Sequence, residues 1–298
     1  MAKRALVLGG GGPVGIAWEA GLLAGLAEGG VDLSDADFIV GTSAGSFVGA
    51  QIAMGKAPGA LAAPILAESA PAPESRPSSD RPAGPPPDLT MLITKMAEAA
   101  SGKRPAREVR AEIGKWALEA KTMSEEAFIA GFGRSFNELP DDTWPERNYA
   151  CTAVDALTGE FVVWNKEAGA GIKRAVASSC SVPGVFPPIT IKGRRYIDGG
   201  MRSATNADLA KGYDVAIVVA VTGAATDKIS EQFRKQLDKE IAVARESGTK
   251  VELIVPDAAS LQAFGINLMD PRKRPGAAKA GLAQGNAQAS SLRAAWKA

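Results

Sequence analysis

The sequence of 298 residues contains no histidine. This absence excludes the Ser-His-Asp triad, the Cys-His dyad and every imidazole metal site. Only two cysteines are present, Cys151 and Cys180, which is too few for a disulfide framework. We expect both to be free, buried thiols in a reducing compartment. Any chemistry must therefore rest on other polar side chains or on backbone groups.

The chain also lacks a dominant charge and a long hydrophobic run. It has 34 basic and 33 acidic residues, so no overall field attracts nucleic acid, and we expect no such partner. No apolar stretch approaches the roughly 20 residues of a membrane-spanning helix, and the N-terminus lacks the apolar core and cleavage site of a signal peptide. We expect a cytoplasmic protein that at most touches a membrane surface. The basic run 271–275 could contact anionic lipid head groups at a membrane surface. Such a run is more often a solvated loop.

Alternating strand and helix patterns predict an α/β fold with a mostly parallel central sheet covered by helices. Strands are predicted at 4–8, 37–40, 149–155, 160–164, 215–221 and 251–255, with a hairpin formed by 189–191 and 195–197. Helices are predicted at 16–28, 46–54, 171–178 and 229–246, and in the tail from residue 276. We expect a single domain over residues 1–298.

An insertion at 56–140 follows the second predicted helix. Its first part, 69–88, is rich in proline, alanine and serine, which favours extended backbone. Helices are predicted at 89–100, 106–120 and 124–136. The insertion is either a lid or one more packed helical layer, and the sequence favours neither. For the apolar side chains at 91–96 we expect core packing more than contact with an acyl chain.

The segment Gly41-Thr42-Ser43-Ala44-Gly45 matches the pattern G-x-S-x-G. A predicted strand leads into it and a helix of small residues leaves it, which is the arrangement of a nucleophile elbow. Such a turn exposes the Ser43 hydroxyl at the sheet edge, while Gly41 and Gly45 let neighbouring backbone pass. The N-terminus of the helix favours developing negative charge. The alternative is a serine that merely caps the helix.

Ser43 needs a base, and without histidine a carboxylate is the candidate. Asp198 is best placed, because it ends a predicted strand and precedes Gly199 and Gly200, which allow other groups to approach closely. An ordinary Asp-Gly turn is the alternative. Two other aspartates are less suitable: Asp155 precedes a predicted hairpin turn, and residue 214 begins a strand at the opposite edge.

The four glycines from Gly9 to Gly12 offer consecutive backbone N–H groups that can form an anion-binding nest before the first helix. This loop and the Ser43 turn follow the first and second strands, so we expect both at one sheet edge. The spacing Gly10-x-Gly12-x-x-Gly15 also fits a dinucleotide fingerprint. That alternative is disfavoured because no acidic residue follows the second strand, and a P-loop lysine is absent.

Taken together, these motifs resemble the patatin-like phospholipase family. The family has a glycine-rich loop, a G-x-S-x-G elbow and a D-G-G or D-G-A motif in this order, and residues 177–188 are similar to its A-S-x-x-x-P-x-x-F-P-P segment. The resemblance covers about 3–56 and 148–222. The matching positions are Gly10, Gly11, Gly12 and Gly15, then Gly41, Ser43 and Gly45, then Asp198, Gly199 and Gly200.

The resemblance implies a Ser-Asp dyad in which Ser43 attacks an acyl carbonyl and Asp198 takes its proton, then activates water against the acyl-enzyme. Backbone N–H groups of Gly11 and Gly12, with Gly10, would hold the oxyanion. No metal or other cofactor is implied, and we expect calcium independence. One departure is Val14, where many members carry arginine or lysine, which puts a preference for anionic phospholipid in doubt.

We therefore expect a serine hydrolase that cleaves ester bonds of phospholipids, lysophospholipids or related acyl esters. One alternative is a lipid-binding or regulatory protein of the same fold with little turnover. A less favoured one is a nucleotide-binding protein of the Rossmann type.

Overall fold

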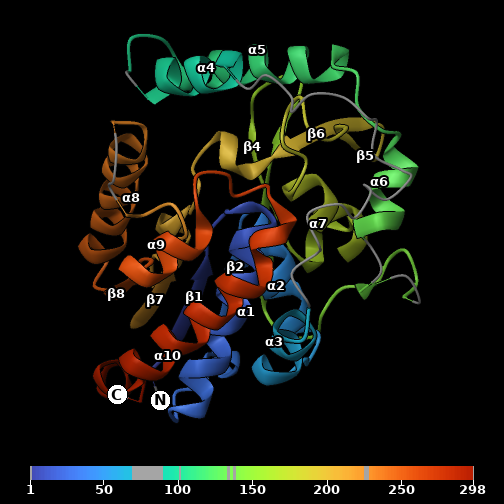
Figure 1. Ribbon diagram of the computed structural model, residues 1–298. Helices are drawn as coiled ribbons and strands as arrows, with labels where there is room; N and C mark the ends of the chain where they lie inside the picture. The colour runs from blue at the N-terminus through green and yellow to red at the C-terminus, as the bar shows by residue number, and fades with distance from the viewer. Residues whose placement is uncertain are drawn as a thin grey trace. The chain divides into compact units, whose positions relative to one another are not determined.

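A computed structural model gives the fold (Figure 1). It describes residues 2–68, 90–100, 102–132, 135–136, 139–224 and 228–297. The chain forms two compact units: Met1–Ala70 with Pro145–Ala150 and Ser203–Ala298, and Pro71–Trp144 with Cys151–Arg202. The predicted single domain stays a prediction, and the proline-rich segment 69–88 lies outside the described residues.

The first unit is built on a parallel sheet. Its strands β1 (Arg4–Leu8), β2 (Phe38–Gly41), β7 (Val215–Val219) and β8 (Lys250–Ile254) lie in the order β2-β1-β7-β8. Leu8 is level with both Gly41 and Val219, so these three strands end at the same edge. The segments that follow β1, β2 and β7 therefore start side by side, which is where ligands bind in parallel α/β sheets.

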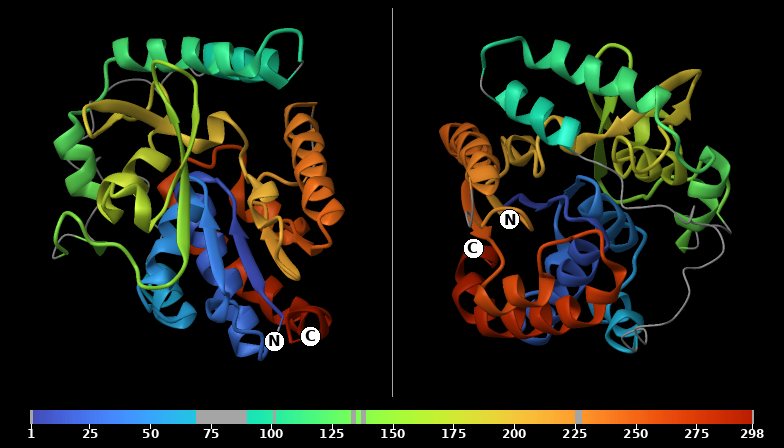
Figure 2. Two further views of the ribbon diagram at one scale, coloured as in Figure 1. Left: turned by 180° about the vertical axis from the view of Figure 1, so that it is seen from behind. Right: turned by 45° about the horizontal axis from the view of Figure 1, so that its top comes forward.

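The described part of the first unit has six α-helices: α1 (Gly12–Glu28), α2 (Ala44–Ala53), α3 (Pro58–Leu66), α8 (Lys228–Glu246), α9 (Ala258–Phe264) and α10 (Arg274–Trp296). Helix α1 begins earlier than predicted, because Pro13 suits its first turn. Helices α3 and α9 were not predicted. Figure 2 shows α10 running alongside α1. A Cβ atom on Gly281 of α10 would lie 2.3 Å from the Trp18 carbonyl oxygen, so this close packing requires glycine.

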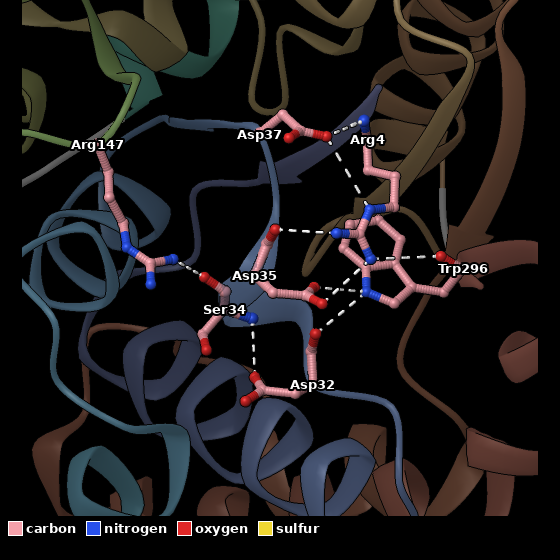
Figure 3. A network of polar contacts seen from close by, with 7 residues as sticks. All are labelled: Arg4, Asp32, Ser34, Asp35, Asp37, Arg147 and Trp296. Carbon is pink, nitrogen blue, oxygen red and sulfur yellow. Dashed lines mark hydrogen bonds and ion pairs between the residues drawn. The ribbon is translucent and has the colours of Figure 1, made fainter. Parts of the chain in front are cut away.

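The end of α10 is tied to the start of the sheet (Figure 3). The Trp296 indole is buried and donates hydrogen bonds to the Asp32 carbonyl (3.0 Å) and to Asp35 Oδ1 (2.8 Å). The Arg4 guanidinium lies 4.9 Å from the centre of the Trp296 ring and donates to Asp35 Oδ2 at 3.1 Å. This cluster stabilises the sheet edge opposite to the loops that carry the predicted site.

The second unit has antiparallel strands. Strand β3 (Tyr149–Asp155) begins in the first unit and continues in the second, where β4 (Phe161–Trp164) and β6 (Arg194–Asp198) pair with it. Strand β5 (Ile189–Ile191) pairs with β6 and confirms the predicted hairpin. The fold class is α/β, as predicted. The parallel strand pairs β1–β2, β1–β7 and β7–β8 all lie in the first unit. Cys151 and Cys180 are both buried and form no disulfide, as expected.

Four helices complete the described part of the second unit: α4 (Thr90–Ala100), α5 (Ala106–Glu119), α6 (Glu125–Phe132) and α7 (Ile172–Ser179). Leu92 of α4 and Ile113 of α5 are buried in one apolar cluster with Val154 of β3 and Ile197 of β6. This burial supports the packed-layer alternative for α4 and α5. None of the helices in the described ranges is long and apolar enough to cross a membrane.

Candidate active site

Ser43 occupies the turn between β2 and α2. Its backbone angles are φ 51° and ψ −116°, and it is one of three non-glycine residues with positive φ in the described part of the chain. Such a conformation costs about 1–3 kcal/mol and is concentrated at functional sites. Ser43 stands at the N-cap position of α2, yet its side chain makes no cap hydrogen bond. The geometry therefore favours the nucleophile elbow over the capping serine.

The two elbow glycines leave no room for a side chain. A Cβ atom on Gly41 would lie 2.3 Å from the Gly45 carbonyl oxygen, and one on Gly45 would lie 2.2 Å from the Leu8 carbonyl oxygen. The Gly45 N–H also donates to the Gly9 carbonyl at 3.0 Å, which joins the elbow to the glycine-rich loop. The sequence pattern thus has a steric cause at both positions.

The glycine-rich loop lies beside Ser43, because a Cβ atom on Gly10 would be 3.2 Å from the Ser43 Cβ. The Gly10 N–H donates to the Ala204 carbonyl at 2.7 Å, so this predicted oxyanion donor already has an acceptor in the structure. The N–H groups of Gly11 and Gly12 make no hydrogen bond within the described residues. They remain the two candidate donors in this loop.

Ala44 is a further candidate donor that the sequence analysis missed. It is the first residue of α2, and its N–H group likewise donates to no acceptor among the residues that the structure describes. The residue after the nucleophile commonly supplies one oxyanion contact in elbow-type hydrolases, so the motif itself carried this signal. Gly15 has a packing role: its N–H bonds to Gly11, and a Cβ atom there would lie 3.4 Å from that of Ala44.

Val14 follows the candidate donors of the glycine-rich loop. Its side chain is fully buried, and its N–H donates to the Leu268 carbonyl at 3.2 Å. The position that many family members fill with a cation therefore belongs to the apolar core here. In the basic run 271–275, two of the three cations have ion-pair partners: Arg272 pairs with Asp270 and Arg274 with Glu68.

A buried carboxyl group, that of Glu19 on α1, lies near the N–H of Gly9 at the start of the glycine-rich loop. Its side chain is 0% exposed, and neither oxygen has a hydrogen-bond partner among the described residues. Burial raises the pKa of Glu19 well above its ordinary value. The nearby Gly9 N–H has a smaller, opposing effect on this pKa, and its own hydrogen bond goes to the Val219 carbonyl. Burial therefore favours the neutral form of the Glu19 carboxyl group. Sequence patterning gives no signal for it.

A polar network that the sequence analysis also missed lies behind the elbow. The Asn206 amide, which is 0% exposed, donates to Thr42 Oγ1 at 2.9 Å and to the Ser203 carbonyl at 2.8 Å. Glu240 of α8 accepts the N–H of Ala207 at 3.0 Å. Burial raises the pKa of Glu240, although hydrogen bonds from Gln236, Ser203 and the Ala207 N–H oppose the shift.

In the second unit, Asp198 ends β6 and is 2% exposed. Its Oδ1 accepts the N–H of Gly200 at 2.7 Å, and its own N–H donates to the Ser181 carbonyl at 3.0 Å. A Cβ atom on Gly199 would lie 2.1 Å from Thr152 Oγ1. The D-G-G motif therefore packs its backbone tightly against β3 and against the segment 177–188.

The rival acidic residue of the second unit has a structural role. Asp155 Oδ1 accepts the N–H groups of Leu157 and Thr158, and its Oδ2 accepts Arg194 Nε at 2.8 Å. Burial favours a higher pKa for Asp155, but the hydrogen bonds of Thr158 and the charge of Arg194 outweigh it and lower the pKa. Asp155 thus closes the β3–β4 turn, as the sequence analysis expected.

The structure gathers one group of predicted residues within the first unit: Gly10, Gly11, Gly12, Gly15, Gly41, Ser43 and Gly45. Asp198, Gly199 and Gly200 belong to the second unit. The first group defines a class of protein: an α/β fold that presents a serine on an elbow beside a loop of backbone donors.

The model of the patatin-like phospholipase family matches residues 6–211, and the chain belongs to this family of lipid acyl hydrolases. A comparison with curated proteins finds no match. Similar solved structures include VipD from Legionella pneumophila, with 14% identity and a TM-score of 0.46 over 98% of this chain and 67% of that one. Another is the type III effector protein ExoU, with 15% identity and a TM-score of 0.43 over 97% of this chain and 53% of that one.

Proposed function

We propose that this protein is a serine lipid acyl hydrolase that cleaves carboxylic ester bonds of phospholipids, lysophospholipids or related acyl esters. The observation that carries the proposal is the strained Ser43 elbow next to the unpaired N–H groups of Gly11, Gly12 and Ala44, counted within the described residues. Membership of the patatin-like phospholipase family supports the lipid class of substrate.

In the proposed reaction Ser43 Oγ attacks the acyl carbonyl carbon while Asp198 takes the hydroxyl proton. The backbone N–H groups stabilise the oxyanion, a kind of contact that is worth about 3–4 kcal/mol for a single donor. The alcohol leaves with the proton, and the acyl group remains on Ser43. Asp198 then takes a proton from water, which attacks the ester and releases the fatty acid.

Labelling with a fluorophosphonate probe tests the proposal without knowledge of the true substrate. We expect the probe on Ser43, no labelling of Ser43→Ala, and labelling at least a hundredfold slower in Asp198→Asn. Two matched controls are Ser291→Ala, an exposed serine on α10, and Asp155→Asn, which removes the carboxylate of the β3–β4 turn. Labelling at another serine, or none in buffer and in detergent, would overturn the proposal.

A further inference from the structure

The segment 203–207 contacts both parts of the candidate site in the first unit. Its Ala204 carbonyl accepts the Gly10 N–H at 2.7 Å, which anchors the glycine-rich loop. Two residues later, the Asn206 amide donates to Thr42 Oγ1, next to the strained Ser43. One short segment therefore contacts the loop that offers oxyanion donors and the turn that offers the nucleophile.

Asn206 is itself held firmly. Its backbone is in the left-handed region (φ 55°, ψ 44°), which asparagine tolerates better than most residues. Its N–H donates to Ser203 Oγ at 3.1 Å, and the next N–H, that of Ala207, donates to Glu240 Oε2. Glu240 in turn accepts Gln236 Nε2 at 2.8 Å within α8. These contacts connect the segment to a long helix.

We infer that Asn206 is a positioning residue for the reaction. Its amide holds the Ser43 elbow through Thr42 Oγ1, and its segment holds the glycine-rich loop through the Ala204 carbonyl. The inference rests on the proposed function. Oxyanion donors act only when they are aimed at the developing charge, and a displacement near 1 Å lowers rates by about a hundredfold. Asn206 touches no reacting atom in this account and acts through Thr42.

A double-mutant cycle tests the inference. Thr42→Val removes the acceptor and keeps the side-chain shape, whereas Asn206→Gly removes the amide and permits the left-handed backbone. We expect kcat on a short-chain p-nitrophenyl ester to fall about 10–100-fold in each variant, with KM changed less than twofold. The double variant should be within twofold of the worse single variant, because both remove one interaction. A trifluoromethyl ketone, which forms a tetrahedral oxyanion, should lose affinity by the same factor as kcat.

Asn286→Ala is the matched control, since it removes an exposed asparagine whose amide donates to Glu28 Oε2 at 2.9 Å. Values of kcat within twofold of this control in both single variants, or losses that multiply in the double variant, would overturn the inference.

Hydrogen exchange of peptides 9–15 and 38–45 gives a readout independent of turnover. We expect faster exchange in both peptides for Asn206→Gly and no change for Asn286→Ala. Unchanged exchange overturns the inference. A parent protein that fails to react with the fluorophosphonate probe overturns the proposed function instead.

Discussion

Replacing Glu19 by glutamine should stabilise the protein, by an amount that grows with pH. The side chain is 0% exposed, its oxygens have no hydrogen-bond partner among the described residues, and burial raises its pKa well above the ordinary value of 4.5. Below pH 4.5 the group is protonated in the folded and the unfolded chain. Above it the unfolded chain loses the proton first, so stability falls as pH rises toward the raised pKa.

Each pH unit within this window changes the unfolding equilibrium of the parent about tenfold, a little over 1 kcal/mol. The advantage of Glu19→Gln should therefore grow as pH rises above 4.5 toward the raised pKa of Glu19. Burying the glutamine amide without partners carries a penalty of its own. That penalty does not depend on pH, so the slope rather than the offset identifies the titration of Glu19.

Urea unfolding at pH 5, 6, 7 and 8, followed by tryptophan fluorescence, measures the difference. Glu28→Gln is the matched control, because Glu28 ends the same helix and is exposed. A difference between Glu19→Gln and the parent that stays constant over this range would refute a protonated, buried Glu19. So would an equal slope in the control.

Three further substitutions test the packing around the site. Gly45→Ala should lower stability by about 1–3 kcal/mol and slow probe labelling, because the new Cβ atom would meet the Leu8 carbonyl oxygen. Gly59→Ala is the control and should do neither, since a Cβ atom there has no neighbour within 4 Å. Equal urea midpoints for the two variants would contradict this prediction. Trp296→Ala should lower the free energy of unfolding by about 3–5 kcal/mol, and a loss below 1 kcal/mol would contradict the role of the buried indole. Val14→Arg should lower the thermal midpoint well below that of Val14→Ile, because the Val14 side chain is fully buried and an arginine there would bury its charge. Equal midpoints for the two variants would contradict the burial of residue 14.

The strand and helix pattern and the motifs of the first unit could be predicted because each has a local cause. Apolar runs define β1 and β7, and Gly41 is required by a contact with Gly45 within the same strand-turn-helix segment. The motif identifies Gly45, although the contact that requires it is with Leu8 of β1. The unpredicted elements have weaker local signals. Helix α3 begins at a proline after the expected break, and α9 has only seven residues.

Long-range partners could not be predicted from one sequence. The Gly10 N–H is taken by Ala204, almost two hundred residues away, and no local pattern reports this hydrogen bond. Asn206 reads as an ordinary turn residue until Thr42 is placed beside it. Glu19 reads as one polar residue on a helix, although tertiary packing buries it completely.

The electrostatics of the loop edge in the first unit rest on backbone rather than on ionisable side chains. Val14 is buried and apolar, and burial raises the pKa of Glu19, which favours the neutral form of that carboxyl group. The candidate donors at Gly11, Gly12 and Ala44 are peptide N–H groups at the starts of α1 and α2, whose strength does not vary with pH.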